Sequence, residues 1–157
     1  MERKAAFRSL IFSLFALGAI LLASQANASS GGISGFSGKN GSTCTSCHGG
    51  GIQPTVTLTG PTSVSTGSTN TYTLTIIGGS DIAGGLDVAA SGGAFAVLDT
   101  VYTELLNGEL VNSQSKKVDA NGALSWTFNW TAPTVSTNTS VMMYAAGLSV
   151  NLNGSTS

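Results

Sequence analysis

The only two cysteines and the only histidine of the 157-residue chain are Cys44, Cys47 and His48. Two thiols three positions apart can add to the two vinyl groups on one edge of a haem, and the residue after the second cysteine can bind the iron through its imidazole. This spacing therefore predicts one covalently attached c-type haem (haem c), held by Cys44 and Cys47, with His48 as an axial ligand of the iron.

The first 28 residues have the three parts of a secretory signal peptide. A short basic start precedes an apolar run over residues 9–23, and a small-x-small pattern follows at residues 25–28. The apolar run is shorter than the ~20 residues of a membrane-spanning helix. We therefore expect an exported chain that begins at Ser29 and resides in the periplasm, at the cell surface or outside the cell.

The cysteine motif allows two other interpretations. A zinc site needs four ligands, and this chain offers three adjacent ones without a second cluster. A redox-active dithiol is expected at the start of a helix in a βαβ unit, whereas a structural disulfide between Cys44 and Cys47 needs only an oxidising compartment. Because export, spacing and the adjacent histidine agree, we favour haem and keep the disulfide as the alternative.

Charged residues are few and mostly acidic. After residue 28 the chain carries three lysines against six carboxylates, a net charge of about −3. Without a basic patch, nucleic acid and anionic membrane surfaces are not expected as partners. The carboxylate pairs Asp81 with Asp87 and Glu104 with Glu109 lack a second histidine or a motif that would frame them for hydrolysis. We expect solvated positions for these four residues and no enzymatic activity.

Two regions follow the signal peptide. Residues 29–53 are Gly- and Ser-rich without periodicity, which predicts an irregular haem-binding segment. Residues 54–157 predict an all-β domain, an antiparallel β-sandwich of the immunoglobulin-like kind. Trp126 and Trp130 alternate with polar residues and are expected in its core. The expected strands are residues 55–59, 71–76, 94–102, 124–130 and 140–150, with turns at Gly60-Pro61, Gly78-Gly79, Gly84-Gly85, Gly92-Gly93, Asn107-Gly108 and Asn121-Gly122.

Several segments resemble a bacterial secreted domain family called choice-of-anchor V. They are GSTCTSCHGG at residues 41–50, GPTSVSTGSTNTYTLTI at 60–76, WTFNWTAP at 126–133 and YAAGLSVNLNGSTS at 144–157. The resemblance covers nearly the whole chain after the signal peptide. It implies a sandwich similar to reeler (reelin N-terminal-like) domains, and a C-terminal sorting or anchoring signal of the kind for which the family is named.

The sequence departs from this family in two respects. Relatives often carry another histidine in the middle of the domain, a plausible second iron ligand, whereas residues 101–117 contain none. Relatives also continue with a further strand and an anchor, whereas this chain ends at Ser157. We therefore expect a C-terminally incomplete sandwich, whose association with the cell surface or outer membrane would depend on the missing anchor.

The second axial ligand of the iron has several candidates. Strand alternation places Met142 on the expected core face, together with Tyr144, Ala146, Leu148 and Val150. It leaves Met143 on a less apolar face with room for a large group. Met143 is therefore the methionine best suited to bind iron, although both methionines can simply fill space. Lys116 or Lys117 would first have to lose a proton. The remaining alternative is an open iron position.

The residues together predict an exported single-haem protein that passes one electron at a time between redox partner proteins. The alternative is an extracellular β-sandwich with an interaction or structural role, in which Cys44 and Cys47 form a disulfide and no haem is bound. An open iron position would instead favour binding of a small ligand such as NO or CO.

Overall fold

The computed structural model describes residues 31–49, 51–79 and 82–152. The expected signal peptide lies outside these ranges. None of the described residues belongs to a helix long and apolar enough to span a membrane. The elements are the 3-10 helix η2 (Cys44–Ser46) and the strands β1 (Thr55–Thr59), β2 (Thr69–Ile77), β3 (Ala83–Ala90), β4 (Ala94–Val97), β5 (Thr103–Leu106), β6 (Glu109–Asn112), β7 (Lys116–Lys117), β8 (Ala123–Thr131) and β9 (Met143–Val150).

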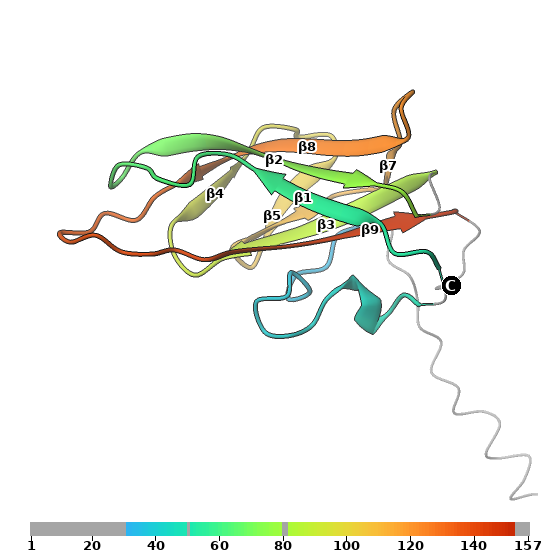
Figure 1. Cartoon of the computed structure of the whole chain (residues 1–157), viewed down its shortest axis with the longest axis horizontal. Coiled ribbons are helices and arrows are strands. Elements are labelled where there is room, and N and C mark those ends of the chain that lie inside the picture. The colour runs from blue at the N-terminus through green and yellow to red at the C-terminus, as the bar shows by residue number, and fades with distance from the viewer. Residues whose placement is uncertain (1–30, 50, 80–81, 153–157) are drawn as a thin grey trace, which may run out of the picture.

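Two antiparallel sheets pack face to face (Figure 1). The first has the strand order β1-β2-β8-β4. In the second, β3 pairs with β9 along its whole length and with β6 and β7 on its other side, and β5 pairs with β6. This arrangement confirms the predicted all-β antiparallel sandwich.

Alternating residues of β2 and β8 fill the space between the sheets. Trp126 and Trp130 are buried, which confirms the core positions expected for them. The ring of Tyr72 lies edge-on to Trp130 with 6.1 Å between the centroids, and is stacked on Phe128 at 6.2 Å. Since burying one large apolar side chain contributes about 1.5–3 kcal/mol, this aromatic layer is a main source of the sandwich's stability.

The Gly84-Gly85 pair, expected in a turn, lies within β3 instead. A Cβ on Gly84 would collide with the backbone oxygen of Leu148, and one on Gly85 with the side chain of Asn112. These glycines therefore permit close approach of neighbouring groups to β3, a role that glycine has within strands. The sequence pattern does not distinguish this role from a turn.

The two Asn-Gly pairs differ in their outcome. Asn107 and Gly108 have φ angles of +52° and +81° and join β5 to β6, which confirms the tight hairpin expected there. At Asn121-Gly122 a tight turn also forms, in which Gly122 donates to the carbonyl oxygen of Asp119 and Asp119 donates to that of Ala123. Only the glycine has a positive φ, and the strands that the turn joins belong to different sheets, so the expected hairpin with two positive φ angles is wrong. The expected strands 94–102 and 140–150 are also too long, since β4 ends at Val97 and β9 begins at Met143.

The second sheet is covered on both faces. Its inner face packs against the first sheet, and residues 31–49, which we call the arm, cross its outer face (Figure 1). Gly32 lies so close to Val111 of β6 that a Cβ at this position would collide with that side chain. The arm has the irregular conformation expected for the Gly- and Ser-rich segment, and it carries the cysteine motif to this face.

The close packing at β3 can be tested by Gly84→Ala. We expect this substitution to lower the free energy of unfolding by about 1–3 kcal/mol, because the added methyl group has to displace β9. Chemical denaturation measures the change. Gly92→Ala is the control, since its Cβ would meet its nearest neighbour at 3.8 Å, an ordinary contact distance. Equal stability of the two variants would contradict the proposed close approach.

Candidate functional site

Cys44, Cys47 and His48 project from a single turn. The carbonyl oxygen of Cys44 accepts the backbone N–H of Cys47 at 3.3 Å and that of His48 at 3.0 Å. The turn therefore keeps the two cysteines and the histidine close together, as the spacing in the sequence suggests. Their surroundings differ, because Cys44 is half-buried and Cys47 is exposed.

A small loop in the arm supports this turn. Ser37 and Thr43 form an isolated antiparallel bridge, and Gly38 and Gly41 between them have positive φ angles that favour glycine. Ser37 is buried, and the carbonyl oxygen of Thr43 accepts the N–H of Ser46. The glycines of this segment therefore shape a defined loop that leads into η2.

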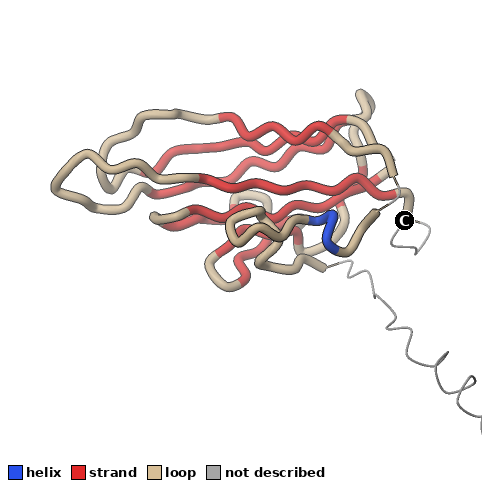
Figure 2. Tube along the Cα trace, turned by 60° about the horizontal axis from the view of Figure 1, so that its bottom comes forward, coloured by secondary structure: helices blue, strands red, loops and turns tan. Residues whose placement is uncertain are grey.

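His48 lines a shallow hollow at the end of β9. In Figure 2 the short helix η2 lies against the strands of the second sheet. The hollow has a volume of about 60 Å³, space for roughly two water molecules. It is lined by Cys44, Thr45, His48, Gly49, Gly51, Ile52, Gln53, Pro54 and residues 147–151.

The two cysteines have different surroundings. Cys44 is half-buried, whereas Cys47 is exposed, and both thiols are free. Burial raises the pKa of the Cys44 thiol to about 11, and the nearby carboxylate of Asp87 acts in the same direction. Because the thiolate is the reactive form of cysteine, Cys44 is the less reactive thiol as long as the arm stays in place.

Asp87 and Glu109 correct the expectation of solvated carboxylates. Asp87 lies on the outer face of β3 and is only 2 % exposed, because the arm covers it. Its Oδ2 accepts the N–H of Phe36 at 2.7 Å, and Oε2 of Glu109 accepts the N–H of Gly35 at 2.5 Å. Both carboxylates therefore anchor the arm. Asp81 lies outside the described residues, and Glu104 is exposed as expected.

One feature of the sequence distinguishes Asp87 from the other carboxylates. It is a single carboxylate within the apolar run of β3, flanked by Leu86 and Val88, which both face the core. Alternation places Asp87 on the opposite face of the sheet, which would ordinarily be solvated. Only the structure shows that the arm covers this face.

The two faces of β9 are the reverse of those expected. Gly147 faces the core, since a Cβ there would collide with Ile76 of the other sheet, and Met143 packs against the core cluster. Tyr144 and Leu148, expected in the core, therefore lie on the outer face, where Leu148 lines the hollow beside the cysteine motif. Apolar residues occur on this face because the arm covers it.

Met143 and His48 are not brought together. The hollow touches β9 from Gly147 onward, and Met143 lies four positions earlier, about 13 Å away along an extended strand. Met143 lines a different cavity, an open cleft of about 920 Å³ that also borders Tyr72 and Trp130. Because both axial ligands must reach the same iron atom, the structure gives no support to Met143 as the second axial ligand beside His48.

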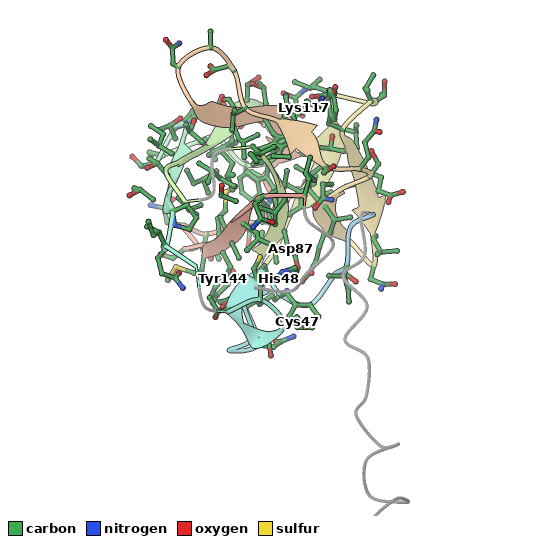
Figure 3. All side chains as sticks on the ribbon, turned by 90° about the vertical axis from the view of Figure 1, so that its right-hand side faces the viewer. Cys47, His48, Asp87, Lys117 and Tyr144 are labelled. Atoms are coloured by element: carbon green, nitrogen blue, oxygen red, sulfur yellow. The ribbon has the colours of Figure 1, made fainter. Side chains whose placement is uncertain are left out.

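The lysines considered as ligands are also remote from the motif. The ammonium of Lys116 lies 3.1 Å from Oδ2 of Asp99 and donates to the carbonyl oxygen of Ser125. In Figure 3 Lys117 lies at the opposite side of the molecule from Cys47 and His48. Among the described residues, no three His, Cys, Asp or Glu side chains gather as ligands of one metal ion would.

A scan against protein-family models and searches of curated proteins and solved structures find no match for this chain. The resemblance to choice-of-anchor V domains therefore stays a prediction.

The unequal burial of the two thiols predicts unequal alkylation. In the reduced protein at neutral pH we expect iodoacetamide to modify Cys47 well before Cys44, because Cys44 is half-buried and its pKa is raised. Peptide mass spectrometry over time gives the order. Unfolding in urea is the control and should bring the two rates close together. Modification of Cys44 first in the folded protein would contradict this arrangement of the arm.

Proposed function

We propose that this protein is an exported single-haem electron carrier of the c-type, in which Cys44 and Cys47 hold the haem and His48 binds its iron. The observation that supports the proposal is that these three residues lie in one turn, in which the carbonyl oxygen of Cys44 accepts the N–H groups of Cys47 and His48. Two thioether bonds to one edge of a flat ring need two thiols close together, and this turn keeps the two cysteines near each other.

The surroundings of the motif fit a haem that stays at the surface. A hollow of about 60 Å³ is too small to enclose one, so most of the group would remain outside it. Ile52, 80 % exposed, lies at this hollow with Leu148 and Val150. None of the residues that line the hollow is Asp, Glu, Lys or Arg. Contact with a large apolar ring would remove these side chains from water, which is favourable.

When bound, the haem would supply a one-electron couple between ferrous and ferric iron. His48 would bind the iron, and Cys44 and Cys47 would prevent loss of the group. Solvent exposure is one of the factors that set a haem's reduction potential, and it gives redox partner proteins direct access. We assign no enzymatic role to the described residues.

The second candidate is an extracellular sandwich with an interaction or structural role. Both thiols lie in one turn and are free, so a disulfide between Cys44 and Cys47 would use the residues needed for haem. An oxidising compartment favours such a bond. The two proposals are therefore mutually exclusive at this motif, and one preparation of the protein can distinguish them.

Haem attachment can be tested by producing the full chain, including its first 28 residues, in a host with a cytochrome c maturation system. We expect a band with haem peroxidase activity on a denaturing gel and a Soret absorption in the purified protein. The double variant with Cys44→Ser and Cys47→Ser should lose the stain, because no thioether can form. Thr45→Ala, which leaves the motif intact, should keep it. A purified chain without stain, and with Cys44 and Cys47 oxidised to each other, would favour the structural role.

The position of Met143 predicts the result of a second substitution. In the haem-loaded protein, Met143→Ala should leave the reduced absorption spectrum unchanged, because Met143 packs against the core and lies away from the hollow. His48→Ala is the comparison and should alter the spectrum by removing an iron ligand. A loss of low-spin bands in Met143→Ala would restore this methionine as an axial ligand.

A further inference from the structure

A pair of carboxyl groups holds the arm on the sheet at one point. Two consecutive amide groups of the arm donate to it, Gly35 to Glu109 and Phe36 to Asp87. Gly35 has a φ of +93°, a conformation that glycine adopts readily and that aims the two successive N–H groups at the sheet. The pair belongs to neighbouring strands, since Asp87 on β3 lies opposite Val111, two residues after Glu109 on β6.

One oxygen of this pair lacks a hydrogen bond. Oδ1 of Asp87 is buried and has no hydrogen-bond partner, although the carboxyl of Glu109 lies within hydrogen-bonding reach of Asp87. Two ionised carboxylates can only accept hydrogen bonds, so neither can satisfy the other. A single proton shared by the pair changes this, because the protonated group donates to its neighbour while the free oxygens still accept the arm amides.

No described cation is bound to the two carboxyls. From the arm, the Cys44 thiol lies near Asp87, and the ammonium of Lys39 is bound to the carbonyl oxygen of Ala90. From β9, Ala146 lies opposite Asp87, and Tyr144, which carries no charge at neutral pH, lies on the same face two residues earlier. From β5, Glu104 lies opposite Val111 and is exposed. None of these neighbouring groups supplies a positive charge that would stabilise a second negative charge on the carboxyl pair.

We propose that Asp87 and Glu109 form a proton-binding site that fastens the arm: with one shared proton the arm is held on the sheet, and loss of that proton releases it. The proposal goes beyond haem attachment and does not depend on it. Release would uncover the half-buried Cys44 and separate the motif from the end of β9, so the occupancy of this proton site regulates the position of the cysteine motif.

The titration of Asp87 supports a response near neutral pH. Burial raises the pKa of Asp87 to about 7, the charge of Glu109 raises it further, and the amide donors of Phe36 and Gly35 act in the opposite direction. The folded protein therefore binds a proton that the unfolded chain releases from about pH 4 upward. The contribution of this proton to stability is present at low pH and is lost as the pH rises through about 7.

Hydrogen exchange of the full reduced chain without haem tests the proposal. After correction for intrinsic exchange rates, we expect protection of the Gly35 and Phe36 amides to fall by roughly tenfold or more between about pH 6 and pH 8.5. Amides of β8 in the core should stay protected over the same range. Constant protection of the arm, or a parallel loss in β8, would overturn the proposal.

Two conservative variants separate titration from simple loss of contact. In Asp87→Asn the side-chain oxygen can still accept from Phe36 and the amide can donate to Glu109, but the group cannot ionise. We expect its arm to stay protected at both pH values. Glu109→Gln should behave alike, whereas the control Glu104→Gln should keep the wild-type pH dependence. Wild-type pH dependence in either Asp87→Asn or Glu109→Gln, or its loss in Glu104→Gln, would overturn the proposal.

Discussion

The contact on which the position of the cysteine motif depends is the one between the arm and the two carboxyl groups of the second sheet. Burying a carboxylate is unfavourable unless hydrogen bonds compensate for the lost water. Asp87 is 2 % exposed and obtains such a bond from Phe36, and Glu109 obtains one from Gly35. These two bonds fix where the arm lies on the sheet, and therefore where the cysteine motif lies, which begins eight residues after Phe36.

The position of the motif has chemical consequences. With the arm in place, Cys44 is turned toward the sheet and Asp87, Cys47 is exposed, and His48 lies at the hollow beside Leu148. The arm covers the apolar outer face of β9, and the proposed haem would cover its end beside the motif. The core of the sandwich is filled by aromatic side chains and leaves no room for a ligand. The candidate site therefore lies at the surface, where the arm meets the outer face of the second sheet.

Much of the fold could be predicted from local pattern. The alternation in β8 and the positive-φ pair Asn107-Gly108 specify a strand and a hairpin through short-range physics, and both are present. The faces of β9 could not be predicted in this way. A strand with apolar residues on both sides has no solvent face to orient it, and the decisive contact, Gly147 against Ile76, joins residues far apart in the sequence. The same limit explains the misplacement of Met143 and the buried state of Asp87.

The docking of the arm is tested most directly by nuclear Overhauser effects between the α-protons of Gly32 and the methyl groups of Val111. A Cβ on Gly32 would collide with this valine, so the two groups lie in contact when the arm is on the sheet. We expect a strong cross-peak between them in the folded chain at slightly acid pH. Its absence, together with random-coil shifts for residues 31–49, would show that the arm does not dock and that the sheet does not position the cysteine motif.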